Sequence, residues 1–200
     1  MNRLSRADLD PDPVAQFRNW LEEAVREGLH EPNAMTFSTA AASGRPSSRI
    51  VLLKAFDHRG LVFATSYESR KGAELAENPW GSLVCYWGSL DRQVRIEGRV
   101  EKTSAKESDE LHRNRPLGSK LACRVSRQSR VIENRRVLEE RLQELSRQLG
   151  DDVPRPRSWG GYRLVPDRWE FWQGRPHRLH DRLCYVLRDD RVWEVRRLAP

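Results

Sequence analysis

Residues 177–182 place two histidines, two arginines and one aspartate within six positions near the C-terminus. If this segment is extended, alternate side chains share a face, and Arg178, His180 and Arg182 project together. Arginine offers a planar stacking surface and a fork that fits phosphate, and histidine titrates near neutral pH. With the aromatic run of residues 169–172 before it, the segment predicts a site for a planar anionic ligand; a solvated edge strand is the alternative.

A second candidate anion site lies at Ser69, Arg70 and Lys71, just before a short helix expected over residues 73–78. Ser69 is the predicted N-cap, and Pro79 ends the helix. The free N–H groups and partial positive charge of a helix N-terminus attract anions, and the two basic side chains add full charges. A capped surface helix with ordinary basic residues is the alternative interpretation.

A third candidate anion site is the segment 115–119, which we expect to be a loop. Arg115 supplies a guanidinium group and Ser119 a hydroxyl, and the two lie within five positions of each other. Pro116 is expected to end the helix predicted before it.

The composition favours a folded chain with anionic partners. The 200 residues include seven Trp, five Phe and four Tyr, which provide large groups for burial in one domain. Lys and Arg number 36 against 29 Asp and Glu, and the formal net charge of +7 attracts nucleic acid or phosphorylated small molecules. Because the arginines are spread over the whole length, with no basic tail or stripe, phosphorylated small molecules are favoured and no nucleic-acid partner is expected.

The cysteines and the hydrophobic runs exclude other classes. Cys85, Cys123 and Cys184 are far apart and form no CxxC pair, so we expect neither a disulfide framework nor a metal site. No run approaches the roughly 18 apolar residues that a membrane span requires, and no apolar leader segment opens the chain. These features predict a cytoplasmic protein without a membrane partner. The histidines without an expected role, which we place on the surface, are His30, His58 and His112.

Hydrophobic periodicity predicts a mainly β chain with helices at its edges. The expected helices cover residues 13–28, 73–78, 104–114 and 131–149. The expected strands cover residues 34–42, 48–56, 61–66, 81–87, 92–103, 159–164, 182–187 and 192–198. The first three strands are expected to form an antiparallel meander because short turns join them. We therefore predict one domain over residues 1–200, a Greek-key or split β-barrel, with a flexible segment over residues 1–12.

Seven short runs, ordered along nearly the whole chain, resemble those of the pyridoxine (pyridoxamine) 5'-phosphate oxidase family. The runs are residues 49–54, 69–71, 92–94, 115–116, 125–129, 159–161 and the C-terminal signature, in which Glu-Phe-Trp-Gln at 170–173 precedes Arg-Leu-His-Asp-Arg at 178–182. The resemblance implies an FMN-binding split β-barrel of Greek-key type that forms a homodimer with each flavin at the subunit interface. It also implies an oxidase that converts pyridoxamine and pyridoxine 5'-phosphate to pyridoxal 5'-phosphate, with oxygen as acceptor and hydrogen peroxide as product.

The resemblance also implies a role for each matching residue. The flavin phosphate and ribityl chain are assigned to Arg49, Arg70, Lys71 and Ser129, and polar contacts to the flavin ring or its chain to Thr65, Gln93 and Gln128. Further cofactor contacts are assigned to Ile50, Val51, Leu52, Leu53, Lys54 and Ala64, and, from the partner subunit, to Trp172 and Arg182. The substrate phosphate is assigned to Lys54, Arg115 and Ser119, and the catalytic pair that covers and orients the pyridine ring to Arg178 and His180.

Two departures from the family pattern fall on the substrate side. Leu111 stands where the family commonly has a tyrosine for the substrate phosphate, and leucine cannot donate a hydrogen bond. An N-terminal extension that closes over the substrate in many members is expected to be missing or shortened. The second hypothesis is therefore a related FMN oxidase with another substrate, of the phenazine-biosynthesis type. A third, from another class, is a non-catalytic module that binds flavin or nucleic acid.

Overall fold

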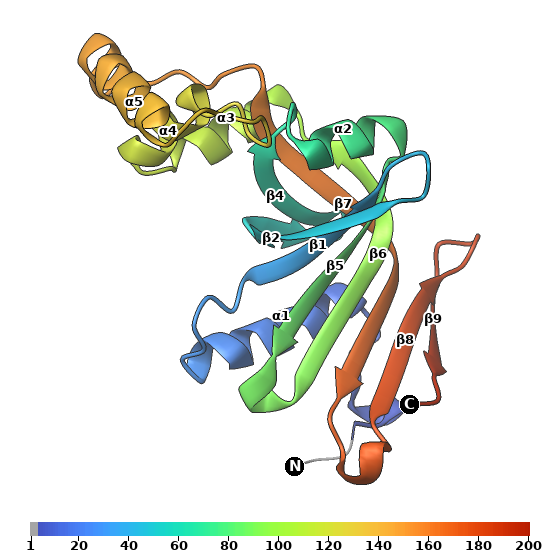
Figure 1. The fold of residues 1–200 in the computed structure, drawn as a ribbon. Coiled ribbons are helices and arrows are strands. Elements are labelled where there is room, and N and C mark those ends of the chain that lie inside the picture. Colours follow the sequence, from blue (N-terminus) through green and yellow to red (C-terminus); the bar gives the residue numbers. More distant parts are fainter. Residues whose placement is uncertain (1–3) are drawn as a thin grey trace.

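The computed structural model describes residues 4–200, which form a strongly curled antiparallel sheet with helices at its edges (Figure 1). The strands are β1 (Ala34–Ala40), β2 (Pro46–Leu52), β3 (Ala55–Asp57), β4 (Gly60–Ser66), β5 (Trp80–Trp87), β6 (Arg92–Lys102), β7 (Trp159–Gln173), β8 (Asp181–Leu187) and β9 (Trp193–Arg197). The helices are α1 (Pro13–Arg26), α2 (Arg70–Glu77), α3 (Ala105–Arg113), α4 (Leu117–Val125) and α5 (Arg136–Leu149), with short 3-10 turns η1 (Arg6–Asp8), η2 (Gly88–Leu90) and η3 (Pro176–Arg178). The predicted mainly β fold with flanking helices is confirmed.

The long strand β7 pairs with three other strands and so connects the parts of the curled sheet. The strand order is β2-β1-β5-β6-β7-β4-β3, and β8 pairs with β7 and β9 outside this path. β7 pairs with β4 through its first half, with β8 through its second half, and with β6 along its length. The register with β6 shifts between Glu97 and Gly98, where a Cβ on the glycine would lie 2.0 Å from the Val165 carbonyl oxygen. Only glycine permits this close approach, which bends both strands.

The antiparallel pairings predicted for the first three strands are present, but they do not form one continuous meander. β2 pairs with β1 and β3 pairs with β4, whereas β2 and β3 lie at opposite ends of the strand order. The strand predicted over residues 48–56 divides into β2 and β3. The backbone N–H of Leu53 donates to the Asn33 carbonyl and that of Lys54 to the Val62 carbonyl, so the chain changes partner at this point.

The region after α3 also differs from the prediction. The expected loop at 115–119 leads into α4, whose first turn forms when the N–H groups of Ser119 and Lys120 donate to the Pro116 carbonyl. Proline at this position has the fixed φ that a helix start requires and needs no N–H partner. The helix expected over 131–149 begins only at Arg136, and the residues before it have no helical structure.

Helix α1 covers one side of the core and begins at the predicted cap. The Asp12 side chain accepts a hydrogen bond from the Val14 N–H at 3.0 Å, and proline occupies the first helical turn. The Phe17 ring, fully buried, lies 5.1 Å from Phe56 and 5.5 Å from Trp169 between ring centroids. These aromatic contacts join the first helix to strands from both halves of the chain.

The N-terminal residues of the described part pack against the C-terminal strands. The buried Leu4 donates its N–H to the Asp181 carboxylate and accepts a hydrogen bond from Arg197 through its carbonyl. Of the segment expected to be flexible, residues 1–3 lie outside the described residues, and the flexibility of 4–12 stays a prediction. The single-domain prediction likewise stays a prediction.

Three further features concern residues 4–200. No helix there combines the length and the apolar character that a membrane crossing demands. No group of three or more His, Cys, Asp or Glu residues in this part is arranged to hold a metal ion. Cys85, Cys123 and Cys184 are free thiols.

Candidate functional site

A cavity of about 370 Å³ lies between β2, β4 and the N-terminus of α2. Seven of its nine lining residues were predicted as flavin contacts, namely Arg49, Ile50, Thr65, Arg70, Lys71, Gln128 and Ser129; Ser47 and Ser48 complete it. The chain segments that supply these residues are distant in sequence. The structure therefore brings together all four residues assigned to the flavin phosphate and ribityl chain, although what they bind stays a prediction.

Helix α2 brings its basic residues to this cavity. Ser69 caps the helix as predicted, accepting the Gly72 N–H. The Arg70 N–H, in the first turn, donates to the Ser129 hydroxyl at 3.2 Å. The 126–130 segment thus meets the helix N-terminus, where backbone donors and the helix dipole favour an anion.

Lys71 is a buried cation with three neutral acceptors. Its Nζ lies 3.1 Å from the Thr65 hydroxyl, 3.2 Å from the Ser69 hydroxyl and 3.1 Å from the Gln128 amide oxygen. Burial, assisted by the charge of Arg49, lowers the pKa of Lys71 to about 8. An anion in the cavity would reverse this shift by stabilising the ammonium form.

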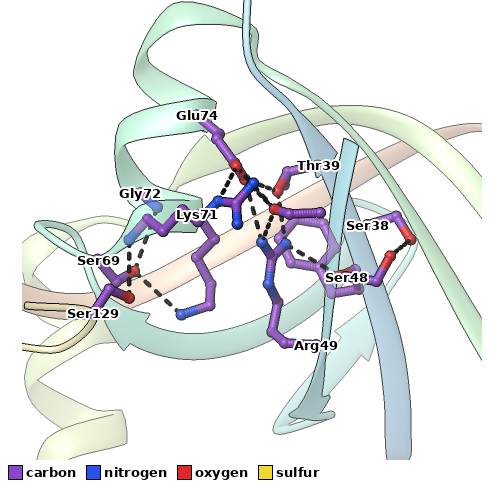
Figure 2. A network of polar contacts seen from close by, with 12 residues as sticks. Ser38, Thr39, Ser48, Arg49, Ser69, Lys71, Gly72, Glu74 and Ser129 are labelled. Carbon is purple, nitrogen blue, oxygen red and sulfur yellow. Dashed lines mark hydrogen bonds and ion pairs between the residues drawn. The ribbon is translucent and has the colours of Figure 1, made fainter. Parts of the chain in front are cut away.

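Glu74 is a charged residue beside this cavity that sequence reasoning missed, as it missed Ser47 and Ser48. Figure 2 shows its carboxylate, from α2, meeting the guanidinium group of Arg49, from β2. The carboxylate accepts hydrogen bonds from Thr39, Ser47, Arg49 and Arg70. Burial alone would raise the pKa of Glu74, but these donors outweigh it and hold the pKa at about 2. The i,i+4 spacing of Arg70 and Glu74 was the signal available in the sequence.

The charges of the cavity suit a phosphate monoester. Arg49, Arg70 and protonated Lys71 contribute three positive charges, and ionised Glu74 removes one. The remaining two positive charges match a phosphate monoester, which carries between 1.5 and 2 negative charges near neutral pH by analogy with phosphorylated side chains. The residues present therefore fit the phosphate group of FMN.

A second set of predicted residues lies in one row across the outer face of the sheet. Tyr86, Gln93, Trp172 and Arg182 are successive cross-strand partners on β5, β6, β7 and β8. The guanidinium of Arg182 binds the buried Glu170 carboxylate at 2.8 Å. This row contains three predicted flavin contacts and is separate from the cavity in this chain.

The expectation of an extended segment from Arg178 to Arg182 is wrong. His177 and Arg178 have φ values of 57° and 61° within and at the end of η3, and β8 begins only at Asp181. The alternation that would place Arg178, His180 and Arg182 on one strand face therefore does not occur. A tight turn replaces it and holds Arg178 and His180 at the end of the β7–β8 connection.

His180 is fixed by contacts within this turn. Its Nδ1 accepts the Arg175 N–H at 3.0 Å, and its ring centroid lies 4.7 Å from that of Trp172. A neutral imidazole that accepts at Nδ1 carries its proton on Nε2, which is then the nitrogen able to donate to a ligand. Arg178 is exposed beside it.

Arg115 and Ser119 are neighbours, as predicted, at the start of α4. The guanidinium of Arg115 lies 4.6 Å above the Trp159 ring and donates to the Ser119 backbone carbonyl at 2.9 Å. Its Nε is buried, and no residue of the described chain accepts from it. Lys54, assigned to the same phosphate, is exposed where β2 leads into β3.

The neighbourhood of Arg115 holds one more correction. His112, expected on the surface, is buried with its ring 5.6 Å from that of Trp159. Burial, assisted by the charge of Arg115, lowers the pKa of His112. Leu111, in the place of the expected tyrosine, packs against Gly161, with Cδ1 2.9 Å from where a glycine Cβ would lie.

Within one chain the predicted residues form groups at opposite ends of the sheet. Figure 1 shows α2 at one end and the β7–β8 turn, with Arg178 and His180, at the other. The phosphate cavity and the predicted catalytic pair therefore do not meet in a single subunit.

Comparisons with known proteins agree with the resemblance noted in the sequence. Residues 21–148 match the family model described as pyridoxamine 5'-phosphate oxidase, and residues 159–200 match the pyridoxine 5'-phosphate oxidase C-terminal dimerisation region. The chain is 55% identical to the pyridoxine/pyridoxamine 5'-phosphate oxidase of Paraburkholderia phytofirmans, over 100% of this chain and 94% of that protein. It is 56% identical to the protein of that name in Burkholderia vietnamiensis, over 98% of this chain and 93% of the relative.

Two solved structures share the fold. PhzG from Burkholderia lata, in complex with tetrahydrophenazine-1-carboxylic acid, superposes with a TM-score of 0.93 at 35% identity and covers 100% of this chain and 98% of its own. A pyridoxamine 5'-phosphate oxidase-related FMN-binding protein from Nostoc punctiforme gives a TM-score of 0.77 at 16% identity, over 96% of this chain and 100% of its own. The latter supports the fold alone.

Proposed function

The chain belongs to the pyridoxamine 5'-phosphate oxidase family, and from that premise we propose that it is an FMN-dependent oxidase of pyridoxamine and pyridoxine 5'-phosphate. The products are pyridoxal 5'-phosphate and hydrogen peroxide, with oxygen as the electron acceptor; from the amine substrate, water hydrolyses the resulting imine and ammonia is also released. The observation that carries the proposal is the cationic cavity at α2, in which seven predicted flavin residues converge around a net charge of +2.

The cavity residues would hold the flavin phosphate, and Gln93, with Trp172 and Arg182 of the partner subunit, would contact the rest of the flavin. Bound FMN would supply the redox chemistry, accepting a hydride from the substrate carbon that bears the amine or hydroxyl and passing electrons to oxygen. The protein's own side chains would then orient the reactants and neutralise phosphate charge.

A homodimer would complete the site. The outer sheet face exposes Ile50 by 62%, Trp80 by 49% and Tyr86 by 65%, an unusual concentration of large apolar side chains on one surface. Tyr86 begins the row that includes Trp172 and Arg182. We propose that two such faces meet, so that the Arg178 and His180 of one subunit approach the phosphate cavity of the other. The match of residues 159–200 to a dimerisation region supports this arrangement.

The substrate phosphate would bind Arg115, Ser119 and Lys54. The buried Nε of Arg115, which has no acceptor in the described chain, is a donor available to an anion. Arg178 and the Nε2–H of His180 would cover the pyridine ring and hold the reacting carbon against the flavin. In this assignment Arg178 and His180 would orient the substrate, and neither would need to exchange a proton with the reacting carbon.

A second candidate function has a specific observation in its favour. PhzG, with a TM-score of 0.93 to this chain, was crystallised with tetrahydrophenazine-1-carboxylic acid, a tricyclic compound without a phosphate. Leu111, packed against Gly161, is an apolar side chain where the family commonly has a tyrosine that binds the substrate phosphate. Oxidation of a phosphate-free tricyclic substrate would not require Arg115 or Lys54, so substitutions at these positions separate the two candidates.

The proposed function is tested by oxygen uptake with FMN-loaded protein. Pyridoxamine 5'-phosphate is expected to be consumed with equal amounts of hydrogen peroxide and an aldehyde that absorbs in the near-visible range. Dephosphorylated pyridoxamine, at the same concentration, is the control and is expected to react poorly. Flavin-loaded protein that oxidises a reduced phenazine precursor but not pyridoxamine or pyridoxine 5'-phosphate would replace this function with the second candidate.

The affinity for FMN is expected to fall as the pH rises above about 8. Lys71 in the ligand-free protein has a pKa of about 8, below its ordinary 10.5, and a bound phosphate dianion raises it. FMN binding above pH 8 then requires proton uptake, and the dissociation constant increases by up to about tenfold per pH unit. Glu74, whose pKa is lowered to about 2, stays ionised across this range and contributes no competing titration.

Fluorescence titration of apoprotein with FMN between pH 7 and 9.5 checks this prediction. Riboflavin, which lacks the phosphate, is the control ligand and should show a flatter profile. A dissociation constant for FMN that does not change over this range would contradict the role assigned to Lys71.

A further inference from the structure

We propose that Glu74 is a positioning residue of the phosphate cavity: one buried carboxylate holds the guanidinium groups of Arg49 and Arg70 in place for an incoming phosphate. The inference rests on the proposed function in one respect, because it takes the phosphate of FMN as the principal ligand. It assigns Glu74 no contact with that ligand. Its role is to orient the side chains that make such contacts.

The geometry divides the carboxylate between the two arginines. Oε1 accepts from Arg70 Nε at 2.8 Å, and Oε2 accepts from Arg49 Nη2 at 3.2 Å. The Ser47 hydroxyl lies within hydrogen-bonding distance of both oxygens, and the Thr39 hydroxyl donates to Oε2. Glu74 is only 7% exposed at its side chain, so its own orientation is fixed by packing and by these donors. A carboxylate with this many hydrogen-bond donors stays ionised at neutral pH.

The two arginines need this support to different degrees. Arg49 also donates to the Phe37 carbonyl and the Thr39 hydroxyl, so several contacts hold it. Arg70 is 56% exposed, and its side chain is held in residues 4–200 only through Nε and Glu74. This bond leaves both terminal nitrogens of Arg70 for a ligand. Without the bond to Glu74, the Arg70 side chain would lose conformational entropy each time the ligand binds, and this loss weakens binding.

If Glu74 acted only as a negative charge, neutralising it should strengthen phosphate binding, because a carboxylate repels a nearby phosphate dianion. The positioning role predicts weaker binding, because the order imposed on Arg70 is lost. The sign of the change in phosphate affinity therefore decides between a positioning residue and a mere counter-charge.

The experiment compares wild-type apoprotein with Glu74→Gln and Glu77→Gln. The Glu74→Gln variant preserves side-chain shape and is expected to weaken FMN binding about three- to tenfold, the range that ordering one long side chain produces. Riboflavin affinity should be unchanged, because the effect acts through the phosphate. Glu77 lies one turn further along α2; within residues 4–200 it accepts a hydrogen bond only from the Ala42 N–H and pairs with neither arginine. Its variant removes the same charge and should leave both affinities unchanged. Should Glu74→Gln fold poorly, Glu74→Asp provides a second variant, expected to lose the Arg70 contact and show the same phosphate-specific loss.

Three results would overturn the proposal. Glu74→Gln could bind FMN as tightly as the wild type or more tightly, it could lose FMN and riboflavin affinity equally, or Glu77→Gln could reproduce its loss. A parallel thermal-shift titration with inorganic phosphate keeps this inference separate from the proposed function. Wild-type protein that binds phosphate but not FMN refutes the FMN assignment, and a weaker phosphate response in Glu74→Gln would still support the positioning role.

Discussion

Mixing Arg70→Ala subunits with Arg178→Ala/His180→Ala subunits is expected to restore about a quarter of wild-type turnover, although each variant alone loses about 100-fold. In a symmetric dimer whose sites each combine the cavity of one subunit with the turn of the other, a heterodimer of the two variants has one site with both lesions and one site with none. Random assortment makes about half of the dimers heterodimers, each with one intact site of two.

The separation of the two groups within one chain is the physical basis for this result. Arg70 begins α2, whereas Arg178 and His180 occupy the turn between β7 and β8 at the other end of the sheet (Figure 1). A site that combines the flavin cavity with Arg178 and His180 would therefore require the turn of a second subunit. The exposed Ile50 and Tyr86 on the intervening sheet face provide apolar surface for that contact.

The complementation is measured by co-refolding the two variants, each with a different affinity tag, and assaying tandem-purified heterodimers with FMN and pyridoxamine 5'-phosphate. Purified heterodimers should reach about half of the wild-type rate per dimer, because one of their two sites is intact. The matched control mixes Arg70→Ala with Lys71→Ala, whose lesions share one cavity, and should recover nothing. Absence of recovery in the first mixture would show that the site does not cross the subunit boundary.

Local patterns in the sequence were sufficient for many of the elements. The cap at Asp12, the cap at Ser69 and the hairpin of β5 and β6 are each determined by residues a few positions apart, and the structure confirms them. The resemblance added what no local pattern contains, since it grouped Arg49 with Lys71 and Ser129, which the fold then brings to one cavity.

The errors arose where distant contacts decide the conformation. Nothing within residues 48–56 shows that Leu53 and Lys54 take partners from different strands, because those partners are Asn33 and Val62. The turn at His177 and Arg178 has positive φ values that non-glycine residues rarely adopt, so an extended segment was the better local expectation. Tertiary packing overrode the local preference in both places.

Glu74 illustrates a third kind of limit. Its i,i+4 spacing to Arg70 was visible, but such pairs are common on exposed helix faces and contribute little there. Its importance depends on burial and on Arg49, Thr39 and Ser47, which approach it from other strands. The charge of a site can therefore be counted from sequence only after the fold shows which carboxylates face it.

Substitution of Arg49 by methionine is expected to lower the free energy of unfolding by about 2–4 kcal/mol and to abolish FMN binding at micromolar concentration. The substitution removes the ion pair to Glu74 and the hydrogen bonds to the Phe37 carbonyl and the Thr39 hydroxyl. Within residues 4–200 the buried carboxylate then keeps only the half-exposed Arg70 as a charged partner, and a buried charge that has lost part of its compensation costs more than the ion pair contributed. Urea denaturation of the apoprotein at pH 7 measures the stability, and flavin fluorescence measures the binding.

The double variant Arg49→Met/Glu74→Gln separates stability from binding. Removing the carboxylate's charge should recover more than half of the lost stability, while FMN binding stays absent because the cavity has lost a cation.

The acid limb of the stability curve provides an independent check on the same pair. In the wild type the pKa of Glu74 is lowered from 4.5 to about 2, so its contribution is complete above pH 4.5 and is lost as the pH falls towards 2. Without Arg49 the pKa is depressed less, and Arg49→Met should lose less stability than the wild type between these pH values. A variant as stable as the wild type at pH 7, with an unchanged acid limb, would mean that Arg49 and Glu74 are not energetically coupled, and the network around the cavity would then be a coincidence of packing.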